Sequence, residues 1–166
     1  MILLISGSLR AGSNAAALRT VHELFADSVL FDGLAMLPHF NPDDDAEPLH
    51  PAVAALRSAI GAADAVLFCT PEYAGALPGS FKNLLDWTIG GGEIYQKPVA
   101  WINVSMRGAD GAHASLRTVL GYAGTQIVED AVAHIPLPPE SMSGGRVTDP
   151  DLRARIADVV AKLVPA

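Results

Sequence analysis

The feature that most constrains the fold of this chain is a regular alternation of short apolar runs with longer amphipathic segments. Residues 1–6 are almost entirely apolar and are closed by Gly7, which is typical of a strand covered on both faces. In the segment that follows, residues 14–25, apolar side chains recur at three- and four-residue spacing, which predicts a helix. The same alternation continues to the end of the chain.

Further strands are predicted for residues 28–31, 65–70, 98–105 and 126–135. Further helices are predicted for residues 53–62, 78–87, 112–122 and 149–163. Strands that alternate with helices build a mostly parallel sheet with helices on both faces. No repeat or linker divides the chain, so we predict a single α/β domain over residues 1–166. It would be a three-layer sandwich with five parallel strands in the order 2-1-3-4-5.

Composition argues against several classes of protein. Half of the residues are hydrophobic, which makes disorder a poor interpretation. No apolar run reaches the roughly 18–20 residues that a membrane span needs, and no basic segment of the signal-peptide type precedes the first strand. We therefore expect a cytoplasmic protein. The formal net charge of −7 argues against nucleic acid or an anionic membrane as a partner, because both require a basic surface.

Two segments are interpreted as purely structural. Residues 38–51 are rich in proline and contain Asp43, Asp44 and Asp45, which predicts an exposed loop whose charges are solvated. Cys69, the one cysteine of the chain, ends an apolar run and is interpreted as a small buried side chain. Neither it nor any histidine has a metal-binding spacing, so no metal site is expected.

The candidate functional residues follow the strands. Unusual loops cover residues 7–14, 71–79 and 105–111, after the first, third and fourth predicted strands. In an open parallel sheet, ligands bind beyond the carboxyl ends of the strands. Because these three strands are neighbours in the predicted order, their loops are expected to converge on one crevice.

The first loop has the composition of an anion site. Its glycines allow amides to turn inward, Ser8, Ser13 and Asn14 supply short hydrogen-bonding side chains, and Arg10 supplies a cation. The start of the following helix adds unpaired N–H groups, so the loop offers local donors on an acidic chain. It lacks the lysine of a P-loop and the glycine spacing of a dinucleotide fingerprint, which favours a single phosphate monoester. The alternative is an ordinary helix start capped by serine or asparagine.

The loop after the third strand is the most distinctive stretch of the chain. It reads Thr-Pro-Glu-Tyr-Ala-Gly-Ala-Leu-Pro-Gly-Ser-Phe-Lys-Asn-Leu-Leu-Asp-Trp over residues 70–87. Its backbone between Pro71 and Gly75 could pass edge-on to a planar ring. In the helix that follows, Lys82 and Asp86 are spaced to form an ion pair. Trp87 is expected to pack in the core or at a subunit contact.

These two loops resemble the motifs of the NADPH-dependent FMN reductase family, a branch of the flavodoxin-like fold. The first is similar to the pattern G-S-x-R-x-x-S, and the second to P-E-Y-N-x-x-x-P-G-x-L-K-N-x-x-D-W. The resemblance implies that Ser8, Arg10 and Ser13 contact the phosphate of FMN. It also implies that the isoalloxazine ring is wrapped by the residues Pro71, Glu72, Tyr73, Ala74 and Gly75.

Two departures from the family pattern concern candidate cofactor contacts. The family continues its first motif as S-x-N, whereas here Asn14 follows Ser13 directly and Ala15 takes the usual asparagine position. Ala74 replaces a second asparagine, which removes a polar side chain beside the flavin. Either the loop is one residue tighter here or one phosphate contact is replaced, and Asn14 is kept as a candidate for phosphate binding.

In the loop after the fourth strand, Ser105, Met106 and Arg107 are candidates for flavin contact, because the family has a glycine-rich turn there. Arg107 could stabilise negative charge on reduced flavin or meet a phosphate of the pyridine nucleotide. A solvent-exposed arginine remains the alternative. His113 opens a helix beside this loop, whereas the other histidines are interpreted as structural or surface residues.

The resemblance implies an FMN-dependent oxidoreductase that takes hydride from NADPH or NADH. Electrons would pass to a small-molecule acceptor such as a flavin or a quinone, with the chemistry on FMN and no catalytic side chain. A homodimer or homotetramer is implied by the same resemblance. The alternative is a flavodoxin-type electron carrier, or a flavin-binding redox sensor without turnover.

Overall fold

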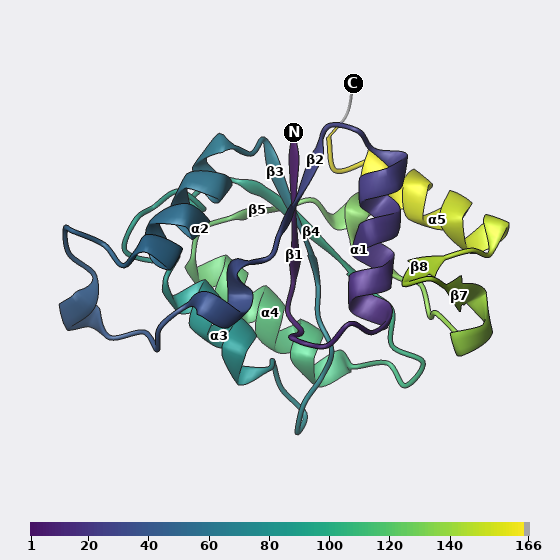
Figure 1. Cartoon of the computed structure of the whole chain (residues 1–166), viewed down its shortest axis with the longest axis horizontal. Coiled ribbons are helices and arrows are strands. Elements are labelled where there is room, and N and C mark those ends of the chain that lie inside the picture. Colours follow the sequence, from purple (N-terminus) through teal and green to yellow (C-terminus); the bar gives the residue numbers. More distant parts are fainter. Residues whose placement is uncertain (165–166) are drawn as a thin grey trace.

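The computed structural model describes residues 1–164, which form a parallel sheet with helices on both faces (Figure 1). The strands of the sheet are β1 (Ile2–Ser6), β2 (Ser28–Phe31), β3 (Ala65–Cys69), β4 (Pro98–Asn103), β5 (Gln126–Ile127) and β6 (Ala133–His134). The helices are α1 (Ser13–Leu24), α2 (Pro51–Ala62), α3 (Gly79–Asp86), α4 (Asp110–Tyr122) and α5 (Pro150–Ala161). The strand order is β2-β1-β3-β4-β5, and β6 also pairs with β4. The predicted flavodoxin-like architecture and strand order are confirmed.

Two hydrophobic cores lie on opposite faces of this sheet, because side chains alternate along each strand. On β3, Val66 and Phe68 pack with α2, α3 and α4, whereas Leu67 and Cys69 pack with α1 and α5. Figure 1 shows this division, with α1 and α5 on one side of the strands and α2, α3 and α4 on the other. The strands that precede the loops at the carboxyl edge of the sheet are buried in these two cores, which fixes where each loop begins.

The fifth strand differs from its prediction. The predicted strand over residues 126–135 is split into β5 and β6 by a 3₁₀ turn at Glu129–Ala131. Glu129 and Asp130 are exposed there, and the Arg117 guanidinium pairs with the Glu129 carboxylate. The chain therefore turns out of the sheet at two adjacent acidic residues, whose side chains are exposed to solvent. The strands on either side, β5 and β6, both pair with β4.

A short hairpin was not predicted. Strands β7 (Met142–Ser143) and β8 (Arg146–Val147) pair antiparallel after the sheet has ended. The Val147 amide donates to Thr20 Oγ1 at 2.9 Å, which fixes the hairpin against α1. Strands of two residues leave no alternating pattern in a sequence, so this element depends on the tertiary contact.

The acidic loop is only partly solvated, contrary to its prediction. Asp43 and Asp44 are exposed, but the Asp45 carboxylate accepts two hydrogen bonds from Arg57 Nη2 on α2, at 2.7 and 2.9 Å. The Asp45 side chain is 13% exposed and the Arg57 side chain 9%. Arg57 Nε also donates to the Trp87 carbonyl at 3.0 Å. This buried pair fastens the loop to the core under α2 and α3.

Two side-chain predictions for α3 can be compared with the structure. Lys82 Nζ lies 2.6 Å from Asp86 Oδ1, which confirms the expected ion pair. Trp87 is 1% exposed and donates from its indole nitrogen to the Pro38 carbonyl at 2.9 Å. Of the two roles considered for Trp87, the structure therefore shows packing in the core. Within residues 1–164, no helix combines the length and apolarity that crossing a membrane requires.

Candidate functional site

The three predicted loops meet at a cavity of about 430 Å³ beyond the carboxyl ends of β1, β3 and β4. We call it the three-loop crevice, and its lining residues are Ser13, Asn14, Pro71, Glu72, Val104, Ser105, Met106, Arg107, Ala109 and Leu137. Its volume lies within the range of about 300–1,000 Å³ typical of small-molecule sites. Most of the lining was predicted from the sequence. Val104, Ala109 and Leu137 were not, since small and aliphatic residues carry no chemical signature.

The start of α1 offers amide groups to this crevice. Gly12 occupies the N-cap position in an extended conformation, and no side chain of the described residues caps the helix. The first helical hydrogen bond runs from the Ala16 amide to the Gly12 carbonyl, so the amides of Ser13 and Asn14 have no helical partner. The alternative of an ordinary serine or asparagine cap is therefore wrong, because both residues lie inside the first turn.

Two serine-arginine turns flank the crevice with the same local geometry. Ser8 Oγ accepts from the Arg10 amide, and Ser105 Oγ accepts from the Arg107 amide, each at 3.1 Å. Both arginines are exposed, and neither forms an ion pair with a carboxylate within residues 1–164. On a chain of net charge −7, two unneutralised guanidinium groups at one edge of the sheet favour an anionic ligand there.

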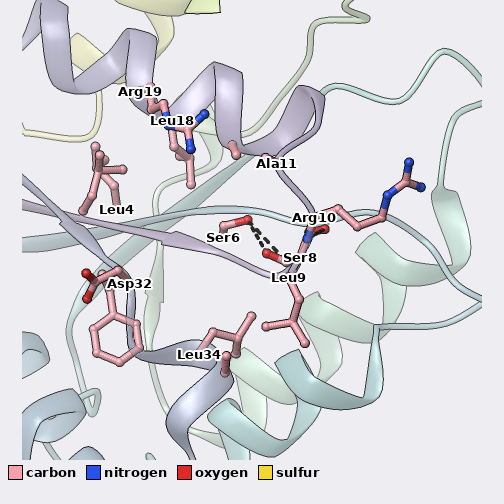
Figure 2. A pocket seen from close by; sticks show the side chains of 14 residues that line it. Leu4, Ser6, Ser8, Leu9, Arg10, Ala11, Leu18, Arg19, Asp32 and Leu34 are labelled. Carbon is pink, nitrogen blue, oxygen red and sulfur yellow. Dashed lines mark hydrogen bonds between the residues drawn. The ribbon is translucent and has the colours of Figure 1, made fainter. Parts of the chain in front are cut away.

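The first loop separates two cavities, whereas a single crevice was predicted. Ser8 and Arg10 line a second cavity of about 320 Å³ on the β2 side of the loop, together with Asp32 and Leu34. In Figure 2 the Arg10 guanidinium extends away from Asp32 and Arg19, and Leu9 points into this second cavity. Ser13 and Asn14 lie on the other side, in the three-loop crevice. The phosphate-binding candidates are thus distributed over both faces of one loop.

The β3–α3 loop contains a two-residue turn. Tyr73 and Ala76 exchange backbone hydrogen bonds of 3.0 and 3.1 Å, and the central residues Ala74 and Gly75 have φ values of 52° and 75°. Positive φ at both positions is the conformation that Asn-Gly sequences favour. The family asparagine at position 74 therefore suits the backbone as well as the flavin. Alanine in the left-handed region is strained by about 1–2 kcal/mol.

Relief of this strain is a testable expectation. Ala74→Gly and Ala74→Asn should each raise the free energy of unfolding by about 1 kcal/mol, because both residues accept positive φ more readily than alanine. Urea denaturation of the three proteins measures the difference. Ala76→Gly, two residues along the same turn, serves as the matched control and should lower stability or leave it unchanged. An Ala74→Gly protein less stable than the parent would contradict the strain.

Glu72 joins the β3–α3 loop to α4. Its Oε2 accepts from the Ala112 amide at 3.0 Å, so the carboxylate occupies the positive end of the helix dipole. Gly111 lies so close to this loop that a Cβ there would overlap the Gly75 carbonyl oxygen. The contact commits the Glu72 side chain to the protein itself.

Asn103, the last residue of β4, holds the β4–α4 loop through hydrogen bonds. Its side chain donates to the Gly108 carbonyl, and its Oδ1 accepts from the Ser105 amide at 3.0 Å. His134 Nε2 donates to the Ser105 carbonyl at 2.8 Å. Neither Asn103 nor His134 was singled out in the sequence. The contact of His134 depends on the pairing of β6 with β4, whereas Asn103 acts within its own loop.

His113 is buried in the first turns of α4. Its Nδ1 donates to the Ala109 carbonyl at 2.7 Å, and its ring stacks on Trp101 with the ring centroids 6.5 Å apart. Burial lowers the pKa of this imidazole more than the Ala109 carbonyl raises it, so His113 is neutral at neutral pH. The residue supports the β4–α4 loop and does not line the crevice.

The crevice suits FMN and not a metal ion. An uncapped helix start and the unneutralised Arg107 line this cavity and can meet a phosphate, while the cavity has room for a flat ring between two loops. Tyr73 and Met106 are exposed by 47% and 61% beside it, as apolar surfaces that a ring could cover. Within residues 1–164, no group of three or more His, Cys, Asp or Glu side chains could hold a metal ion.

Comparison with known proteins identifies the family of this chain. A family profile described as NADPH-dependent FMN reductase matches residues 1–137. The chain is 33% identical to "Probable NADPH:quinone oxidoreductase 2" of Oryza sativa subsp. japonica, over 96% of this chain and 84% of the rice protein. It is 32% identical to "NADPH azoreductase" of Bacillus sp. (strain OY1-2), over 79% and 77% of the two chains.

A solved structure is similar along nearly the whole chain. The flavoenzyme NAD(P)H:(acceptor) oxidoreductase FerB from Paracoccus denitrificans superposes with a TM-score of 0.81 and 30% identity. The superposition covers 98% of this chain and 96% of that one. From the family profile, the relatives and the shared fold, the chain belongs to the NADPH-dependent FMN reductase family.

Proposed function

We propose that this chain takes hydride from NADPH or NADH through FMN in the three-loop crevice and passes electrons to a small-molecule acceptor. One observation carries the proposal: the loops after β1, β3 and β4 meet at one cavity beside a helix start without a side-chain cap. Unpaired amides that could bind an anion, next to a space for a flat ring, support the binding of FMN by a chain of an FMN reductase family.

The FMN phosphate would bind at the start of α1. The amides of Ser13 and Asn14 lack helical partners there. Ser8, which lines the second cavity, would reach the phosphate from the other side of the same loop and donate its hydroxyl hydrogen. Arg10 would pair with the phosphate oxygens through its guanidinium fork. These groups supply local positive charge against the unfavourable field of an acidic protein.

The isoalloxazine ring would lie between two loops. The backbone from Pro71 to Gly75 would read one edge of the ring, while Ser105 and Met106 would line the other side. The Arg107 guanidinium would lie near the ring and stabilise the negative charge of the reduced form. Bound FMN supplies the hydride-accepting and electron-donating chemistry, so the protein needs no acid, base or nucleophile of its own.

The acceptor would be a small molecule of the quinone or flavin type. The names of the rice and Bacillus relatives refer to quinone and azo substrates, which supports acceptors of this kind here. We place the protein in the cytoplasm as a homodimer or homotetramer. Ile89, Tyr95 and Tyr122 are exposed by 53%, 63% and 90%, as large apolar side chains that a subunit contact would cover. Light scattering during gel filtration measures the assembly.

The decisive experiment is a titration of the apoprotein with FMN, followed by turnover with NADPH or NADH and a quinone acceptor. We expect quenching of flavin fluorescence at one equivalent and steady oxidation of at least one of the two nucleotides. A protein that binds no FMN, or whose FMN neither nucleotide reduces, would overturn the proposal. A long-lived semiquinone without turnover would identify an electron carrier instead.

Arg10→Ala is the matching variant. Loss of a charge-assisted contact of about 1.5–3 kcal/mol should raise the Kd for FMN by about 10- to 100-fold. Arg155→Ala is the control, because it removes the same charge from an exposed position on α5, far along the chain from the loops. If both variants bind FMN equally well, Arg10 has no part in phosphate binding.

A further inference from the structure

The asparagine that departs from the family motif has an unusual environment. Asn14 lies in the first turn of α1, is 9% exposed and lines the three-loop crevice. A buried amide needs hydrogen-bond partners on both its oxygen and its nitrogen, since each unpaired group costs about 1–3 kcal/mol. The partners of Asn14 therefore show what its side chain is arranged to do.

The partner of the Asn14 oxygen is the single cysteine of the chain. Cys69, the last residue of β3, has 0% exposure, and its Sγ donates to Asn14 Oδ1 at 3.2 Å. Burial raises the pKa of the Cys69 thiol far above its usual range, so the thiol keeps its proton across the physiological pH range. The S–H group is thus a permanent donor, and an amide that faces it with its oxygen is correctly oriented.

The amino group of Asn14 is then left for the crevice. Within residues 1–164, Asn14 Nδ2 donates to no protein acceptor. The nitrogen is nevertheless accessible from outside the protein. An amide nitrogen that is unpaired and still accessible, on a residue that lines the crevice, offers its hydrogens to whatever occupies that space.

We propose that Cys69 is a positioning residue for the cofactor, holding the Asn14 amide so that its N–H donors point into the three-loop crevice. There they donate to an oxygen or ring nitrogen of bound FMN, which makes the inference dependent on the proposed function. The pair gives this chain a flavin contact in place of the asparagine that the family motif has at the position of Ala15. Without the thiol, the amide is free to present either its oxygen or its nitrogen.

The contact itself can be tested on the apoprotein by infrared spectroscopy. Because the chain has one cysteine, its S–H stretch is a single band. A thiol that donates to an amide oxygen absorbs at lower frequency than a free thiol, so Asn14→Ala should move the band to higher frequency. A band already at the free-thiol position in the parent protein, or one that Asn14→Ala leaves in place, would overturn the inference.

The consequence for the cofactor is tested by a double-mutant cycle of FMN affinity. Asn14→Ala and Cys69→Ala should each raise the Kd by about 3- to 10-fold, the usual effect of one hydrogen bond. The double variant should lose no more than Asn14→Ala alone. Cys69→Ser keeps a donor and should bind FMN more tightly than Cys69→Ala. Losses that multiply in the double variant would show that Cys69 acts independently of Asn14.

Leu67→Val is the control for packing. Leu67 lies two residues before Cys69 on β3 and packs in the same core, so the substitution removes buried volume without touching the amide. It should lower stability and leave the Kd for FMN unchanged. If the parent protein itself binds no FMN, the proposed function fails, while the infrared band still decides whether Cys69 orients Asn14.

Discussion

Replacing Gly111 with alanine is expected to raise the Kd for FMN by at least about 10-fold and to lower the free energy of unfolding by about 1–3 kcal/mol. A Cβ at this position would overlap the carbonyl oxygen of Gly75 and approach Glu72 Oε2 to 3.0 Å. A backbone oxygen cannot move away by a change of rotamer, so the β3–α3 loop and α4 must separate. That separation opens one wall of the three-loop crevice.

Gly121→Ala provides the control within the same helix. A Cβ at Gly121 meets nothing within 4 Å, so alanine there should stabilise α4 by about 0.5–1 kcal/mol and leave FMN binding unchanged. Denaturant titration and flavin fluorescence measure both effects on both proteins. A Gly111→Ala protein that binds FMN as tightly as the parent would show that FMN binding does not require contact between the β3–α3 loop and α4.

Replacing Asp45 with alanine is expected to lower the free energy of unfolding by about 3–5 kcal/mol. The Arg57 guanidinium would keep its bond to the Trp87 carbonyl but lose both contacts to a carboxylate, in a position where its side chain is 9% exposed. A buried charge without its counter-ion accounts for the size of the effect. Thermal or urea denaturation measures it.

Asp43→Ala in the same loop removes the same charge from an exposed position and should change stability by less than about 0.5 kcal/mol. Combining Asp45→Ala with Arg57→Met should recover part of the loss, because an apolar side chain of similar length tolerates the buried site. Equal losses in the Asp43 and Asp45 variants would mean that the ion pair does not hold the loop.

The architecture could be predicted because it depends on local patterns. Each buried strand is a short apolar run, each helix has an apolar stripe, and the parallel order follows from their alternation. Asp45 shows where such patterns fail. Its neighbours Asp43 and Asp44 carry the same side chain but are exposed to solvent. Only Asp45 lies close enough to Arg57 to form the ion pair, and the sequence does not show that proximity. The split of the fifth strand at Glu129 likewise needed the contact with Arg117.

The convergence of the three loops could also be predicted, since distinctive residues at the ends of neighbouring strands must meet. The family assignment that rested on two of these loops is confirmed by the profile match and the relatives. The finer geometry could not be predicted. That Glu72 binds α4, and that Ser8 and Ser13 face different cavities, depends on how closely the loops approach one another. The individual cofactor contacts remain predictions.

The helix start without a side-chain cap affects how stable the protein is when its ligand is scarce. Where a ligand satisfies groups that the apoprotein leaves open, its binding free energy adds to the free energy of folding. Free FMN at a hundred times its Kd would add about 2.7 kcal/mol, which lowers the unfolded fraction about a hundredfold. Proteases act on that fraction. The abundance of this protein would therefore rise and fall with the concentration of free FMN.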